Sequence, residues 1–140
     1  MSERRKEVVR RFGELCLGKG DLPLVAELVD EDVVDHRPMP GQLPGRRGII
    51  DGIRAIRTAF PDLHVVAEDL VADGDLVCAR WLLTGTHQGA FAGLAPTGRP
   101  FSIGGLELYR LAGNRIVELW PYFDTLSLFS QLEPIGDAHP

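Results

Sequence analysis

The chain contains little of what marks several common classes of protein. Only two of its 140 residues are cysteines, and Cys16 and Cys78 each lie inside an apolar pattern. A disulfide framework is therefore excluded, and two buried free thiols are expected. The sequence also lacks an apolar run long enough to cross a membrane, and its charged N-terminus is unlike a secretion signal. We expect a cytoplasmic protein with no membrane partner.

Positive charge is scarce as well. Fifteen lysines and arginines stand against 20 aspartates and glutamates, which gives a net charge of −5, and the one short basic run is residues 4–6. This balance argues against a nucleic-acid partner. The four histidines show no close pairing and the cysteines lack CxxC spacing, so no metal site is predicted. Neither a phosphate-binding loop nor a nucleophile elbow is recognisable, and no organic cofactor is expected.

What the chain does contain is the composition of an ordinary globular protein. Apolar residues make up 44% of it and charged residues 25%, values that argue against disorder. A chain of this length can bury a substantial core as one unit. We predict a single domain over residues 1–133 and a C-terminal tail over residues 134–140.

The first half of the chain has the spacing of amphipathic helices. Apolar residues recur every three or four positions in three segments: residues 2–17, 21–29 and 49–60. Gly18 and Gly20 end the first helix, Asp21 caps the second, and Pro61 ends the third. A brief strand is predicted at Val33 and Val34, followed by a proline-rich loop over residues 38–45.

After Pro61 the pattern becomes extended. Strands are predicted over four segments: residues 63–72, 76–87, 101–111 and 115–124. Gly74 and Gly113 each lie in a short turn that joins two of these strands into a hairpin. A long loop covers residues 88–99, and a last helix covers residues 125–132. Helices followed by antiparallel hairpins predict an α+β fold, a cone in which helices pack into a curved sheet around a pocket.

The last strand has the most distinctive side chains. Alternation places four of them on one face: Glu118, Trp120, Tyr122 and Asp124. A carboxyl group walled by aromatic rings would have a raised pKa, so we interpret Asp124 as a general acid/base facing the pocket. The alternative is that Asp124 caps the following helix. Pro121 cannot donate to a sheet ladder and predicts an edge or a bulge.

The ordered set of motifs resembles a known family, the SnoaL-like polyketide cyclases of the nuclear-transport-factor-2-like superfamily. The resembling segments are VVDHRPMPGQLPGRRGI at residues 33–49, residues 59–91, residues 95–124 and the last helix. They cover nearly the whole predicted domain. The resemblance implies a cofactor-independent enzyme that closes a ring in a hydrophobic, carbonyl-bearing polyketide by intramolecular aldol condensation.

The resemblance also implies roles for individual residues. The family's catalytic aspartate at the end of the last strand matches Asp124, and its cavity histidine matches His36. Family members carry a histidine on the preceding strand, where this chain has Glu107, Tyr109 and Arg110 instead. Arg80 or Tyr109 could then supply a second hydrogen-bond donor.

Other readings remain open for these residues. We expect the pocket wall to contain large side chains: Phe60, Trp81, Leu83, Trp120 and Tyr122. Glu107 either faces solvent or is a buried acid with a partner, and His36 is either a catalytic residue or an anchor for its loop.

Other functions also remain open. Epoxide opening would use Asp124 with Glu107 and either Arg80 or Arg110. Allylic isomerisation, dehydration, cofactor-free hydroxylation and a non-catalytic ligand-binding module are further alternatives. An open curved sheet with apolar outer residues also predicts a homodimer or a higher homo-oligomer.

Overall fold

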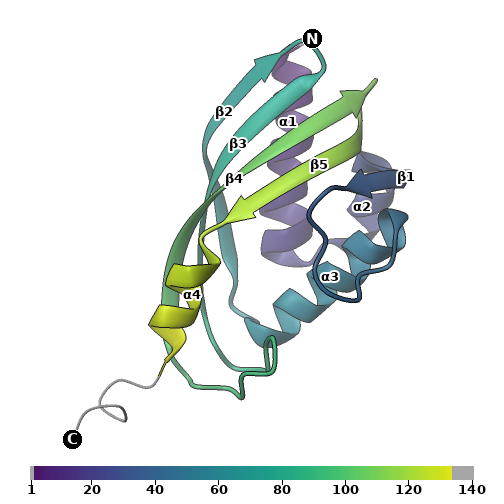
Figure 1. Ribbon diagram of the computed structural model, residues 1–140. Coiled ribbons are helices and arrows are strands. Elements are labelled where there is room, and N and C mark those ends of the chain that lie inside the picture. The colour runs from purple at the N-terminus through teal and green to yellow at the C-terminus, as the bar shows by residue number, and fades with distance from the viewer. Residues whose placement is uncertain (1, 134–140) are drawn as a thin grey trace, which may run out of the picture.

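The computed structural model describes residues 2–133, in which helices cover one face of a five-stranded sheet (Figure 1). Its elements are α1 (Ser2–Arg11), the π-helix η1 (Phe12–Leu17), α2 (Leu22–Leu28), β1 (Val29–Asp35), α3 (Gly45–Ala59), β2 (His64–Asp73), β3 (Leu76–Thr86), β4 (Pro100–Ala112), β5 (Arg115–Phe123) and α4 (Thr125–Leu132). The expected tail over residues 134–140 lies outside the described residues.

The sheet has the strand order β1-β5-β4-β3-β2. Strands β2 to β5 pair antiparallel with their neighbours, whereas β1 runs parallel to β5. Figure 1 shows the long strands twisting strongly, with α1, α2 and α3 on one side and α4 continuing from the end of β5. The predicted α+β cone with a curved, mixed sheet is confirmed.

The first helix is not α-helical throughout. It changes to a π-helix at Phe12, where the indole ring of Trp81 packs directly on Gly13. A Cβ atom on Gly13 would lie only 2.2 Å from that ring, so a residue without a side chain is required there. The wider π turn therefore coincides with the place where the sheet pushes its largest side chain against the helix.

Strand β1 is longer than the sequence predicted, because it begins at Val29 rather than near Val33. Its middle residues, Asp30 to Asp32, are polar and at least partly exposed, since β1 lies at the edge of the sheet. Such a segment lacks the apolar alternation that identifies a strand in sequence. Val33 is buried and Val34 is 47% exposed, so alternation resumes where the core begins.

Pro121 lies beyond the end of β1. The Leu119 carbonyl accepts from the His36 N–H at 2.9 Å, so the backbone groups of Leu119 face β1. Pro121, two residues later, faces the same side, where β1 has already ended at Asp35. The missing N–H of proline therefore costs no ladder hydrogen bond, although β5 is an interior strand of the sheet and not the edge strand that was predicted.

Candidate active site

A cavity of about 300 Å³ lies between the sheet and α3, and we call it the central cavity. Most of its wall is apolar and comes from α3, the inner sheet face and α4: Ile49, Ile53, Ile56, Phe60, Leu83, Phe101, Ile103, Leu119, Phe123 and Leu128. Phe91, in the loop between β3 and β4, closes part of the wall and packs on Phe60 with ring centroids 5.2 Å apart. This lining suits a small hydrophobic molecule.

Five polar residues interrupt the apolar wall. They are Asp35, Arg37, Gln42, Glu107 and Thr125. The first three come from the end of β1 and the loop that follows it, whereas Glu107 projects from the middle of β4. Few but convergent polar groups in an apolar hollow are typical of small-molecule sites.

Glu107 is the buried carboxyl group of this site. Alternation along β4 points it inward together with Phe101, Ile103 and Tyr109, all of which are buried. The Tyr109 hydroxyl donates a hydrogen bond to Glu107 Oε1. Of the two readings the sequence left open, the buried acid with a partner is therefore the one observed.

Burial raises the pKa of Glu107 from 4.5 to about 7. This value is the net result: the negative charge of Asp35 also raises the pKa, while the hydrogen bond from Tyr109 and the nearby indole N–H of Trp81 lower it. Burial and the Glu107 charge raise the pKa of Tyr109 well above its ordinary value, so Tyr109 remains a donor. A carboxyl group that titrates near neutral pH in a cavity is suited to both accept and return a proton.

Asp35, at the end of β1, is held in place by hydrogen bonds to the loop that follows it. Its Oδ1 accepts from the backbone N–H of Arg37, and its Oδ2 accepts from the side-chain amide of Gln42, both at 2.9 Å. The Gln42 amide oxygen in turn accepts from the Met39 N–H at 3.0 Å. The side chain of Gln42 thus fastens the loop after β1 to the cavity carboxylate.

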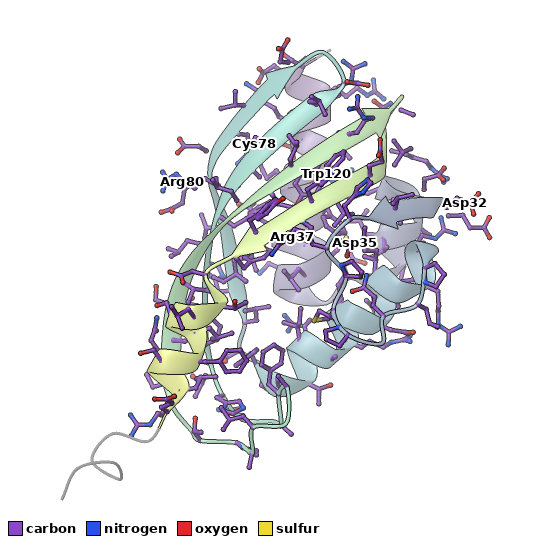
Figure 2. The ribbon with its side chains drawn as sticks, viewed as in Figure 1. Asp32, Asp35, Arg37, Cys78, Arg80 and Trp120 are labelled. Carbon is purple, nitrogen blue, oxygen red and sulfur yellow. The ribbon has the colours of Figure 1, made fainter. Side chains whose placement is uncertain are left out.

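Sequence reasoning missed Asp35, although a signal was present. Val33 and Asp35 are alternate residues of one strand, so the burial of Val33 turns Asp35 inward and leaves Val34 and His36 outside. The resemblance directed attention to His36 instead of its neighbour. Figure 2 shows Asp35 between the end of β1 and the helices, whereas Asp32 projects away from the domain.

The prediction that the Asp124 carboxyl faces the cavity is wrong. Asp124 is exposed, and its Oδ1 accepts from the Ser127 N–H at 3.1 Å as the N-cap of α4. It adjoins a different hollow, on the outer face of the sheet. The predicted alternation along β5 is present, but Leu119 and Phe123 line the cavity, so the polar face points outward. The catalytic role of Asp124 stays a prediction that no cavity contact supports.

Three further predicted site residues share this outer face. His36 stacks on Trp120 with ring centroids 4.4 Å apart, and its Nε2 lies 2.9 Å from Glu118 Oε1. Tyr122 is 53% exposed, and the guanidinium of Arg37 lies 4.2 Å from its ring centroid. The expectation that His36, Trp120 and Tyr122 line the pocket is therefore wrong, because the aromatic face of β5 is its outer face.

The remaining predicted residues divide between inside and outside. Arg80 points outward and forms ion pairs with Glu68 and Asp69 at 2.9 and 2.6 Å, on the left of Figure 2. Trp81 is buried against the π-helix rather than in the cavity wall. Phe60 does line the cavity, as predicted.

The thiols and possible metal ligands add no further chemistry to this site. Cys16 is buried and Cys78 partly exposed, and both are free. Burial, with the nearby charge of Asp21, raises the pKa of Cys16 to about 12. Within residues 2–133, no three His, Cys, Asp or Glu side chains are grouped so that they could hold a metal ion. No helix in this part of the chain is long and apolar enough to cross a membrane.

Comparison with known proteins gives a consistent result. The model of the family described as SnoaL-like polyketide cyclase matches residues 7–132. No functionally curated protein matches the chain.

Solved structures resemble the chain over most of its length. IdmH from Streptomyces antibioticus, named as a candidate polyketide cyclase, is 32% identical with a TM-score of 0.81, over 91% of this chain and 97% of that one. A candidate polyketide cyclase from Bacillus cereus is 26% identical with a TM-score of 0.81, over 92% and 80% of the two chains. AclR from Streptomyces galilaeus, named as a candidate hydroxylase, is 25% identical with a TM-score of 0.79, over 94% and 82%.

Proposed function

Because the chain belongs to the SnoaL-like polyketide cyclase family, we propose that it is a cofactor-independent enzyme acting on a hydrophobic, carbonyl-bearing small molecule in the central cavity. The reaction we favour is ring closure of a polyketide by intramolecular aldol condensation, with Glu107 as the general acid/base. The observation that carries this assignment is a carboxyl group buried in an apolar cavity with its pKa raised to about 7. Asp124 lacks such an environment.

The reaction needs one group that moves a proton twice. The ionised Glu107 carboxylate removes a proton from the carbon between two carbonyl groups, and the carbanion attacks a third carbonyl carbon of the same molecule. A carbon–carbon bond forms, the carbonyl π bond breaks, and the resulting alkoxide takes the proton back from Glu107. Tyr109 holds Glu107 Oε1 throughout and leaves Oε2 for the substrate. Such proton transfer contributes roughly 10²–10⁴-fold to the rate.

Shape supplies the rest of the acceleration. The apolar wall folds a flexible chain so that its reacting carbon and carbonyl meet, which replaces a rare encounter in solution by a preset one. Well-oriented intramolecular reactions gain up to about 7–11 kcal/mol in this way. The cavity volume of about 300 Å³ lies at the lower end of the range for small-molecule pockets.

The alternatives differ in how much support they retain. Epoxide opening by Asp124 with Glu107 and either Arg80 or Arg110 loses its basis, because only Glu107 lines the cavity and the other side chains lie on the outer face. Isomerisation, dehydration and cofactor-free hydroxylation could use the same Glu107, and a structural relative is named as a candidate hydroxylase. A ligand-binding module without chemistry is the non-enzymatic alternative.

The test compares two carboxylates on one substrate panel. Aromatic β-dicarbonyl compounds able to close a ring are incubated with wild type, Glu107→Gln and Asp124→Asn, and cyclised product is measured by mass spectrometry. We expect Glu107→Gln to lose roughly 10²–10⁴-fold in kcat and Asp124→Asn to remain within about twofold. The reverse pattern would return catalysis to Asp124, and no turnover by wild type would favour the binding module.

We also propose that a second copy of the chain covers the outer face of the sheet. Leu106 and Tyr122 are 50% and 53% exposed there, beside the partly buried Leu108 and Trp120. These side chains form an apolar patch bordered by the ion pairs of Arg80 and Arg110, and a twofold pair would bury it.

A further inference from the structure

The charges around the central cavity are unevenly placed. Among the described residues that line it, the ionisable ones are Asp35, Glu107 and Arg37. Two of these three are acids. Which ligands the cavity admits therefore depends on the position of its one cationic side chain, Arg37.

Arg37 lines the cavity, but its guanidinium group lies against the outer sheet face. Its N–H donates to Asp35 Oδ1, while its guanidinium lies over the ring of Tyr122, a residue of the outer sheet face. The cation–π contact holds the positive charge on that side. Among the described residues, no arginine side chain forms an ion pair with Asp35 or Glu107.

A helix N-terminus could also attract an anion, and α4 begins at the cavity with Thr125. The Asp124 carboxylate caps this helix and accepts from the Ser127 N–H, so the positive end of the helix dipole is already neutralised. The capping residue that the sequence suggested as catalytic thus removes a source of positive potential near the cavity.

The two cavity carboxyl groups keep free acceptor capacity. Each Asp35 oxygen accepts one hydrogen bond from the protein, and a carboxylate offers about four acceptor positions. Glu107 Oε1 accepts from Tyr109, and the indole N–H of Trp81 lies near the same carboxyl group, so its roughly four acceptor positions are not all used. A ligand donor can therefore be accommodated, whereas a ligand carboxylate would meet acceptors and negative charge.

From this arrangement we infer that the central cavity selects ligands by charge. It admits hydrophobic molecules whose polar end is neutral or cationic and donates a hydrogen bond, and it rejects those that carry a carboxylate. Asp35 is the residue that determines this specificity. The inference rests on the proposed function only in placing the substrate in the same cavity.

The experiment measures binding and needs no turnover. Three ligands with one naphthalene body and different polar ends are used: a carboxamide, a methylamine and a carboxylate. Affinities for the wild-type chain are determined by calorimetry near pH 8, where Glu107 is mostly ionised. We expect the amide and the amine to bind at least about tenfold more tightly than the carboxylate.

A matched pair of variants assigns the effect. Asp35→Asn removes one negative charge from the cavity wall, and Asp32→Asn removes the same charge from an exposed position on the same strand. Asp35→Asn should reduce the affinity difference between the amide and the carboxylate several-fold. Asp32→Asn should leave this difference unchanged. If Asp35→Asn does not fold, the three wild-type affinities still decide the matter.

Equal or tighter binding of the carboxylate, or no binding of any of the three, would overturn the inference. If Asp35→Asn and Asp32→Asn change the affinity difference between amide and carboxylate by the same amount, Asp35 does not determine the specificity. None of these results affects the comparison of turnover in Glu107→Gln and Asp124→Asn, so failure of charge selection and failure of the proposed catalysis are distinguishable.

Discussion

Glu107 is the residue at which this fold departs most from the usual preference for apolar side chains in a core. Its carboxyl group is buried, has one hydrogen-bond donor in Tyr109 and lies near the negative charge of Asp35. Burying such a group costs free energy whenever it is ionised. A chain selected only for stability would place an apolar residue there, so this cost is consistent with a functional role.

The cost of Glu107 predicts how stability depends on pH. Its pKa is raised from 4.5 to about 7 on folding, so its contribution is fully present below pH 4.5 and is lost as the pH rises through 7. The difference corresponds to about 3 kcal/mol. The glutamine of Glu107→Gln cannot ionise, so the free energy of unfolding of this variant should increase relative to wild type as the pH rises from 4.5 through 7. Urea unfolding at both ends of this range measures the difference.

A matched substitution separates this effect from a general change in charge. Glu31 is exposed on β1, and Glu31→Gln should follow the wild-type dependence on pH. If the stability of Glu107→Gln also followed the wild-type dependence on pH, the pKa of Glu107 would not be raised in the folded state.

The sequence allowed part of this residue-level picture to be predicted. Alternation along the last strand correctly separated Leu119 and Phe123 from Glu118 and Asp124. It did not reveal which face was inward, because Trp120 made the polar face look like a pocket wall. The neighbour whose charge raises the pKa of Glu107 is Asp35 on β1, which is far from β4 in sequence, and no local pattern records this proximity.

At the scale of elements, α4 depends on its first residue. Asp124 is the N-cap, and its side chain satisfies the Ser127 N–H. Asp124→Ala should therefore lower the free energy of unfolding by about 1 kcal/mol, whereas Asp124→Asn, which keeps an acceptor, should change it by only a few tenths. Urea unfolding followed by tryptophan fluorescence measures both.

Ser130 provides the comparison on the same helix. It is exposed and Ser130→Ala leaves the cap intact, so its stability should match that of wild type. Equal losses in Asp124→Ala and Asp124→Asn would show that the charge, rather than the capping hydrogen bond, supports α4.

Elements with strong periodicity were predicted well, and those without it were not. The last helix was predicted over the residues that form α4, and both hairpin turns were located from Gly74 and Gly113. The π-helix was missed because its cause, the contact between Gly13 and Trp81, joins distant parts of the chain. The start of β1 was missed because an edge strand rich in aspartate resembles a loop.

At the scale of the whole molecule, the sheet has one covered face and one open face. Helices α1, α2 and α3 cover the inner face (Figure 1), while Leu106 and Tyr122 remain exposed on the outer one. We expect the chain to form a dimer through the outer face, so Leu106→Glu should shift the mass in solution from two chains toward one. Light scattering after size-exclusion chromatography measures this mass.

Leu43 offers a control for the added charge. It is 51% exposed in the loop before α3, and Leu43→Glu should leave the mass unchanged. A wild-type mass of one chain at high micromolar concentration would contradict the proposed dimer.

The shape of the fold could be predicted from sequence because it depends on many residues, whereas the site depends on a few side-chain orientations. The measurement that tests the account most directly is therefore a titration of Glu107 itself. The carbon-13 shift of its side-chain carboxyl carbon is followed against pH in selectively labelled protein, and Glu107→Gln identifies the signal. We predict a midpoint near 7. A midpoint near the ordinary value of 4.5 would show that the group is solvated, and it would leave the central cavity without its acid/base.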